Sequence, residues 1–186
     1  ADTGYSFATW SGCTPVVGTP THCTVAMTAD TTVSATFTAN TYTLQVSVPA
    51  HGTITGTGIS CDPSDLASSA DCRETVTFDQ QYTYSVAADT GYSFAAWGGD
   101  CVTNGDGTCT ITADTTPTVS ATFTANTYTL QVSVPAHGTI TGTGISCATG
   151  GDATSADCRE TVTFAQQYTY SVAADTGYSF AAWGDR

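Results

Sequence analysis

Eight cysteines are the residues whose spacing most directly suggests chemistry. They fall into four pairs, each bracketing a short polar loop: Cys13 and Cys23, Cys61 and Cys72, Cys101 and Cys109, and Cys147 and Cys158. Of the many pairings that eight cysteines allow, local closure of each loop is the simplest. Zinc knuckles need cysteines about two to four residues apart, a spacing that the chain lacks. Stable disulfides form in oxidising compartments, so we expect an extracellular or cell-surface protein.

Acidic side chains in glycine-rich loops raise the question of calcium. Asp100, Asn104 and Asp106 place oxygen atoms within D-C-V-T-N-G-D-G, and oxygen ligands suit Ca²⁺. The full run of alternating acids with its bidentate glutamate is missing. We therefore name these three residues as calcium candidates, but expect solvated loop acids and no bound metal or other cofactor.

The remaining reactive residues do not form a catalytic pattern. The three histidines are His22, His51 and His137, and no G-x-S-x-G motif accompanies them. Glu74 and Glu160 could in principle act as a carboxylate pair. They occupy the same position in two sequence repeats, and each follows an arginine, which favours surface Arg–Glu ion pairs. We expect no catalytic residues and no enzyme activity.

Composition excludes two classes of partner. The chain has 186 residues, with three basic and sixteen acidic side chains and a formal net charge of −13. A nucleic-acid binder needs a basic surface to neutralise phosphates. No apolar run approaches the ~20 residues of a membrane-spanning helix. We therefore expect neither nucleic-acid binding nor membrane insertion.

The chain is a tandem repeat with a period of about 86 residues. The sequence A-D-T-G-Y-S-F-A occurs at 1–8, 88–95 and 174–181, and residues 38–61 return unchanged at 124–147. The copies differ mainly in the cysteine-bracketed loops. This pattern predicts a constant scaffold that carries variable loops.

The repeat unit begins at T-Y-T-L-Q-V and ends at A-T-F-T-A. Residues 1–39 are then the C-terminal part of a repeat, 40–125 one complete repeat, and 126–186 the N-terminal part of a third. Part of a β domain would expose unpaired strand edges. We expect either that the polypeptide continues in both directions, or that copies associate head to tail and complete each other's repeats.

Alternating polar and apolar residues predict antiparallel strands with one buried face. The alternation is clear at 41–48, 80–87 and 118–125, and further strand candidates lie at 51–59, 74–78, 91–97 and 109–113. Trp10, Trp97 and Trp183 each follow G-Y-S-F-A. We expect them to be core aromatic residues of a small β domain. The alternative is an exposed platform for a sugar ring.

The sequence G-Y-S-F-A-x-W, followed by Gly, a Cys-bracketed loop and a terminal S-A-T-F, resembles the divergent internalin-type B-repeat of bacterial surface and secreted proteins. The resemblance implies a compact β module, β-grasp-like in fold, used in tandem as a stalk or adhesive region. It implies no catalytic residues. The long acidic loop between Cys61 and Cys72 departs from the family pattern.

These observations predict an all-β protein of disulfide-stapled antiparallel modules that form a rod. The function we expect is structural, as an adhesin stalk or a subunit of an extracellular filament. The alternatives are a glycan- or protein-binding module that displays its variable loops, and an accessory array of a secreted enzyme. The partners we expect are further copies of the chain, head to tail, or a glycan or host surface.

Overall fold

The computed structural model describes residues 1–184 and is almost entirely β, which confirms the all-β prediction. The last two residues of the expected third segment, 126–186, lie outside the described residues. Helical structure within 1–184 is limited to the 3-10 turns η1 (Ala70–Cys72) and η2 (Ala156–Cys158). The β-grasp-like detail is therefore not matched, because that fold packs a helix on its sheet. No helix in the described part is long and apolar enough to cross a membrane.

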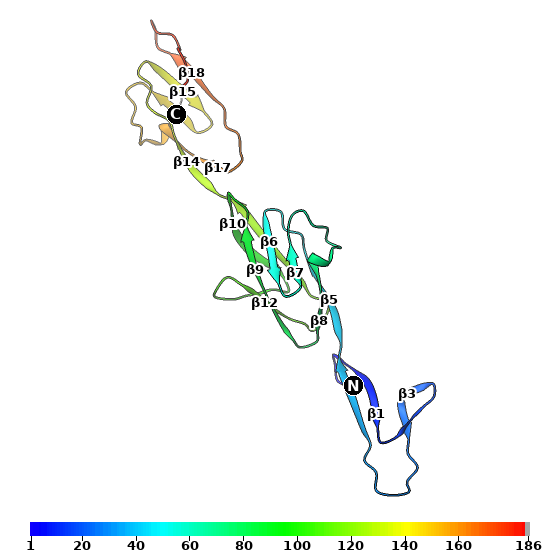
Figure 1. The fold of residues 1–186 in the computed structure, drawn as a ribbon. Coiled ribbons are helices and arrows are strands. Elements are labelled where there is room, and N and C mark those ends of the chain that lie inside the picture. The colour runs from blue at the N-terminus through cyan, green and yellow to red at the C-terminus, as the bar shows by residue number, and fades with distance from the viewer. Residues whose placement is uncertain (185–186) are drawn as a thin grey trace. The chain divides into compact units, whose positions relative to one another are not determined.

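The strands follow the repeats along the chain (Figure 1): β1 to β4 correspond to β10 to β13, and β14 to β18 correspond to β5 to β9. The first segment contains β1 (Tyr5–Ser11), β2 (Thr14–Val16), β3 (Thr19–Thr24) and β4 (Ser34–Ala39). The complete repeat contains β5 (Thr41–Val46), β6 (Gly52–Gly56), β7 (Ile59–Cys61), β8 (Arg73–Thr77), β9 (Gln81–Ala88), β10 (Tyr92–Gly99), β11 (Val102–Thr103), β12 (Cys109–Thr112) and β13 (Thr118–Ala125). The third segment contains β14 (Thr127–Gln131), β15 (Gly138–Gly142), β16 (Ile145–Ala148), β17 (Arg159–Thr163) and β18 (Tyr170–Ala174).

The complete repeat forms two sheets, with strand orders β10-β13-β5-β8 and β11-β12-β9-β6-β7. Most of the pairs are antiparallel, as the alternation predicts. One pair is parallel: β13 lies beside β5, with Thr118 opposite Gln45 and Val119 opposite Val46. Alternation specifies which face of a strand is buried but not the direction of its neighbour. This parallel pair is an exception within the antiparallel modules that the alternation predicts.

The core of the complete repeat lies between these two sheets. Leu44, Val46, Ile54 and Val119 have no exposed surface, and Tyr84 is 1% exposed. They come from β5, β6, β9 and β13, and each lies on the apolar face that period-two alternation predicts. The core therefore requires strands that are far apart in the sequence.

The third segment has a smaller core. Its strands form only the pairs β14-β17 and the order β16-β15-β18. The buried cluster consists of Ile145, Cys147 and Cys158. The predicted strand at G-Y-S-F-A-A-W does not form here, and residues 175–184 are irregular. In the complete repeat this strand, β10, pairs with β13, and no described strand takes the place of β13 in the third segment.

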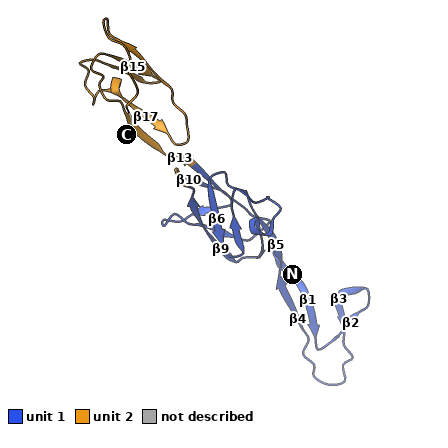
Figure 2. Cartoon of the chain, turned by 45° about the horizontal axis from the view of Figure 1, so that its top comes forward, with its two compact units in different colours: residues 1–89, 94–123 blue, residues 90–93, 124–186 orange. Residues whose placement is uncertain are grey.

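The chain divides into two compact units, which are coloured separately in Figure 2. Unit 1 contains residues 1–89 and 94–123, and unit 2 contains residues 90–93 and 124–186. These borders differ from the repeat borders expected at 39/40 and 125/126. The reason is that residues 90–93, from the middle of the complete repeat, pack against Asn126 and Phe164 of the third segment.

Asn40 forms that junction in unit 1 and is the single residue between β4 and β5. Its backbone N–H donates to the Gly4 carbonyl at 2.8 Å, and its own carbonyl accepts the Phe78 N–H at 2.8 Å. Its side-chain Oδ1 accepts the Ser6 hydroxyl at 2.6 Å. The Tyr5 ring meets the Phe78 ring edge-on, with centroids 5.6 Å apart. The backbone N–H, the backbone carbonyl and the side-chain Oδ1 of Asn40 thus all form hydrogen bonds.

Asn126 repeats these contacts in unit 2. Its N–H donates to the Gly91 carbonyl and its carbonyl accepts the Phe164 N–H, both at 2.8 Å. The Ser93 hydroxyl donates to its Oδ1 at 2.6 Å, and the rings of Tyr92 and Phe164 lie 5.6 Å apart. The junction is therefore a specific structure that the sequence encodes twice.

Gly91 provides a test of this junction. Its φ is +83°, and a Cβ placed on it would overlap the Phe164 ring. Gly177 is the matching residue of the next copy, with a φ of +90° and no neighbouring atom within 4 Å. We expect Gly177→Ala to destabilise unit 2 only through the left-handed backbone, by about 1–2 kcal/mol. Gly91→Ala should cost about 1–3 kcal/mol more, because the ring must move.

Differential scanning calorimetry of the two variants measures this difference directly. Backbone strain is common to both substitutions, so it cancels. Equal melting temperatures for the two variants would contradict the proposed packing of Phe164 against the junction glycine.

Candidate functional site

The disulfide-closed loops are the candidate functional sites, because they are where the repeats differ. The structure joins the cysteines in sequence-local pairs: Cys13–Cys23, Cys61–Cys72, Cys101–Cys109 and Cys147–Cys158, separated by 10, 11, 8 and 11 positions. The loops leave and re-enter the sheets at these bonds. The sheets and their core therefore fix where each loop begins and ends, but they do not constrain the sequence within the loop.

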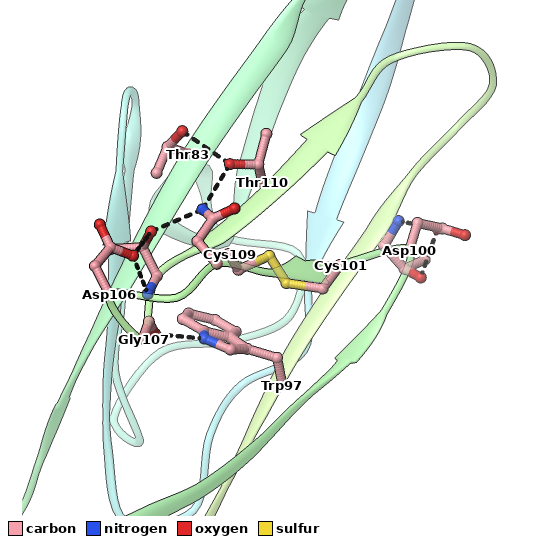
Figure 3. The surroundings of a disulfide bond; sticks show 11 residues. Thr83, Trp97, Asp100, Cys101, Asp106, Gly107, Cys109 and Thr110 are labelled. Carbon is pink, nitrogen blue, oxygen red and sulfur yellow. Dashed lines mark hydrogen bonds between the residues drawn. A yellow bond between two sulfur atoms is a disulfide. The ribbon is translucent and has the colours of Figure 1, made fainter.

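The loop between Cys101 and Cys109 is held by polar contacts as well as by its disulfide (Figure 3). The Trp97 indole N–H donates to the Gly107 carbonyl at 2.9 Å. Asp106 Oδ1 accepts the Thr108 N–H at 3.0 Å and the Thr108 hydroxyl at 2.7 Å. These hydrogen bonds hold the pKa of the Asp106 carboxyl below its ordinary value. The Asn104 amide donates to the Thr108 and Thr110 hydroxyls.

The other loops use the same devices. Trp10 donates its indole N–H to the Pro20 carbonyl at 3.1 Å, as Trp97 does in its own loop. Asp62 and Asp152 each accept a hydroxyl and a backbone N–H from the residue two positions on, and the pKa of both carboxyls is lowered by these bonds. The acids in these loops therefore stabilise turns.

The calcium candidates do not converge. Asp100 accepts the Thr118 N–H at 2.7 Å and the Thr118 hydroxyl at 3.0 Å. Asp100 and Asp106 lie on opposite sides of the disulfide in Figure 3. The one metal-ligand-like cluster among residues 1–184 is Cys61, Asp65 and Cys72, whose two sulfur atoms are bonded to each other. A disulfide offers no thiolate, so this cluster is not a metal site.

The predicted Arg–Glu ion pairs are wrong. Glu74 Oε2 accepts the Tyr84 hydroxyl at 3.0 Å, whereas Arg73 donates to the Ala67 carbonyl at 3.1 Å. Adjacent residues of a strand point to opposite faces of the sheet, which separates the two charges. Burial raises the pKa of the Glu74 carboxyl. In the next copy, Tyr170 donates to Glu160 at 2.8 Å and Arg159 donates to Gln131.

The tryptophans differ in burial. Trp97 is partly buried against the core of the complete repeat, and Trp10 has intermediate exposure in the first segment. Trp183 is 52% exposed and does not belong to the buried cluster of its segment, so the core expectation is wrong for it. The physical reason is that the strand corresponding to β10 does not form around Trp183 in the described part of the third segment.

Two of the histidines, His137 and His22, each contact a neighbouring side chain in the described part of the chain. The His137 ring stacks on the Tyr178 ring, with centroids 3.8 Å apart and planes at 9°. His22 Nδ1 lies 3.3 Å from the hydroxyl of its neighbour Thr21 on the exposed surface. Neither contact supplies a third group that would orient the imidazole for base catalysis.

Exposed apolar side chains mark three of the four loops, a feature that the sequence analysis missed. Val17 is 100% exposed, Leu66 72% and Val102 67%, and each lies between a different pair of bonded cysteines. The sequence could have predicted this exposure, because each of these large apolar residues lies in a short polar loop between two cysteines. A loop closed by a disulfide can present such a side chain at low entropic cost.

Comparison with known proteins supports a repeat-module identity for part of the chain. Residues 1–41 match the model of the divergent InlB B-repeat domain family. This segment contains β1 to β4 and the first disulfide. Searches of the curated proteins and of the solved structures found no match to the chain. Over residues 1–41 the chain is therefore similar to a bacterial surface repeat module.

Removing one disulfide at a time should distinguish two contributions to the free energy of unfolding, namely closure of the loop and packing of the core. Replacing Cys13 and Cys23 with alanine should lower the free energy of unfolding by about 2–3 kcal/mol, the value for closing a short loop. Replacing Cys101 and Cys109 should cost more, because Cys109 is completely buried beside Tyr84. Guanidinium unfolding of the two double variants measures the difference. A reducing agent that left the wild-type melting curve unchanged would contradict the disulfide assignment.

The Tyr–Glu pairs predict how stability depends on alkaline pH. Burial, and then the Glu160 carboxylate, raises the pKa of Tyr170 to about 12, and burial and Glu74 raise the pKa of Tyr84 as well. An unfolded tyrosine ionises near pH ~10. The stabilisation is therefore complete below pH ~10 and is lost as the pH rises toward the folded-state pKa.

Urea unfolding at neutral pH and at about pH 11 measures this loss. We expect the loss to shrink in the double variant Tyr84→Phe, Tyr170→Phe. The control is Tyr128→Phe, whose side chain is 51% exposed. An alkaline loss of the same size in the double variant and the wild type would contradict the assignment.

Proposed function

We propose that this protein is a non-catalytic structural module of a bacterial surface or secreted repeat protein, serving as an adhesin stalk or as a subunit of an extracellular filament. The observation that carries the proposal is the repeat junction at Asn40 and Asn126. Four disulfides and the similarity of residues 1–41 to a surface repeat domain support an extracellular location.

The junction favours a mechanical role because it contains no linker. A single asparagine connects the strands on either side, and both of its backbone groups are bonded within the same unit. Bending at this residue would break two backbone hydrogen bonds and the bond from the neighbouring serine. Each such bond contributes about 1 kcal/mol. Repeats joined in this way are expected to resist bending, as a stalk or filament requires.

The charge composition is consistent with the same role. The net charge of −13 makes neighbouring chains repel each other, which keeps extended surface proteins apart. The chain contains no lysine and three arginines, so it offers few cleavage sites to trypsin-like proteases. Both features suit a protein that remains exposed outside the cell.

A second candidate function is binding through the disulfide-closed loops. The exposed Val17, Leu66 and Val102 favour it, because each is held out from the surface by a bonded pair of cysteines. A glycan or host protein is the partner class that this arrangement suits. In this reading the repeat scaffold positions the loops, and their sequence differences determine what is bound.

Electron microscopy of the native, unreduced protein at physiological salt tests the structural role. We expect straight particles in the wild type and more bent ones in the variant Ser93→Ala, Asn126→Gly, which loosens one junction. A matched control is Thr103→Ala, which changes an exposed position in the Cys101–Cys109 loop. Freely jointed particles in the wild type would contradict the stalk or filament role and favour loop-mediated binding.

A further inference from the structure

The loop between Cys101 and Cys109 contains an asparagine directly followed by a glycine, Asn104-Gly105. In this dipeptide the asparagine side chain is open to attack by the next backbone nitrogen, because glycine has no Cβ to hinder it. Gly105 is exposed, and a Cβ placed on it would meet no atom within 4 Å. The surroundings of Gly105 therefore leave room for a ring to close on its nitrogen.

The reaction that this pair supports is deamidation, to which the chemical lability of asparagine is due. The Gly105 nitrogen attacks Cγ of Asn104, a bond forms between these two atoms, and the Cγ–Nδ2 bond breaks. Nδ2 leaves as ammonia, carrying the proton of the Gly105 N–H. The resulting succinimide takes up a water molecule, which opens one of its two carbonyl groups and leaves aspartate or isoaspartate. Water is the only co-reactant.

In the folded loop both amide hydrogens of Asn104 are already engaged. Nδ2 donates to the Thr108 hydroxyl at 2.8 Å and to the Thr110 hydroxyl at 2.9 Å. The Thr108 hydroxyl in turn donates to Asp106 Oδ1 at 2.7 Å. The Asn104 backbone is held as well, because its N–H donates to the Thr108 carbonyl at 2.8 Å. Rotation of the side-chain amide toward the Gly105 nitrogen therefore breaks two hydrogen bonds.

We propose that Asn104 is a site of spontaneous deamidation, and that the hydroxyls of Thr108 and Thr110 keep it unreacted while the loop is intact. The chain has two other asparagines, Asn40 and Asn126, and each is followed by threonine. The branched Cβ of threonine crowds the backbone, so these two positions lack the open nitrogen of Gly105. This inference goes beyond the proposed structural role and does not depend on it.

Conversion of Asn104 is irreversible and changes the loop. An ionised carboxylate has no donor, so neither bond from Nδ2 can form again. The Thr108 hydroxyl has a single hydrogen, which Asp106 accepts. A further negative charge would then lie in the segment that carries the exposed Val102, in a chain whose net charge is already −13. A local opening of the loop would thus leave a permanent change in its charge.

Mass spectrometry after incubation at mildly alkaline pH tests the proposal, with peptide mapping to locate the loss of ammonia and gain of water. We expect slow conversion of Asn104 in the native, oxidised chain. In the reduced chain unfolded in urea, conversion should be at least about tenfold faster, because two hydrogen bonds of ordinary net strength correspond to that factor or more. Asn40 and Asn126 are internal controls, and both should stay unconverted over the same period.

Substitutions of the threonines then test the protective contacts. Thr110→Val should raise the native rate about fivefold, because one hydrogen bond of ordinary net strength corresponds to that factor. The double variant Thr108→Val, Thr110→Val should react faster still. Thr83→Val is the matched control: its hydroxyl lies 3.2 Å from that of Thr110 on the neighbouring strand (Figure 3), and the variant should react like the wild type. Valine suits a strand as well as threonine does, so these variants keep the sheet.

Each outcome decides the proposal. An Asn104 that stays unconverted in the unfolded chain would overturn the site itself. Native conversion as fast as in the unfolded chain would overturn the protection, as would a double variant that reacts no faster than the wild type. If Thr83→Val reacted as fast as Thr110→Val, the effect would belong to the strand pair rather than to the Asn104 contacts, which would also overturn the inference.

Discussion

The buried core of the repeat depends on one parallel strand pair, β13 beside β5. Where it forms, Leu44, Val46 and Ile54 lose all contact with water. In unit 2, where no described strand takes the place of β13, the equivalent residues Leu130 and Ile140 are only partly buried, although their sequence is unchanged. The same residues therefore form a core or an open groove, according to whether a strand about 75 residues away joins the sheet.

The disulfides stabilise the loops that this core leaves outside the sheets. Three of the four close a short segment in which a threonine or serine donates hydrogen bonds to a nearby aspartate. Such bonds need only a local spacing, so the loops can change sequence without disturbing the sheets. This division explains how the repeats keep identical scaffold residues while the segments between cysteines differ.

The sequence correctly predicted those features that depend only on residues close together in the chain. Period-two alternation located β5, β9 and β13, and the repeated cysteine spacing suggested loops closed on themselves. It failed where the outcome depends on direction or on distant partners. It did not predict that Glu74 would bond Tyr84 rather than Arg73, because that contact joins β8 and β9, which belong to different sheets. It also treated Trp183 like Trp97, because their neighbours in the chain are the same.

The sequence by itself determined that this is an acidic, cysteine-rich, all-β repeat protein without a basic surface for nucleic acid, since composition, period and alternation are properties of the chain alone. Only the tertiary structure decided which strands are neighbours, that one of the pairs is parallel, and that a single asparagine carries the hydrogen bonds of each repeat junction. The physical reason is that burial and pairing depend on residues brought together from distant positions. Identical sequence copies can therefore differ in exposure, as Phe37 and Phe123 do.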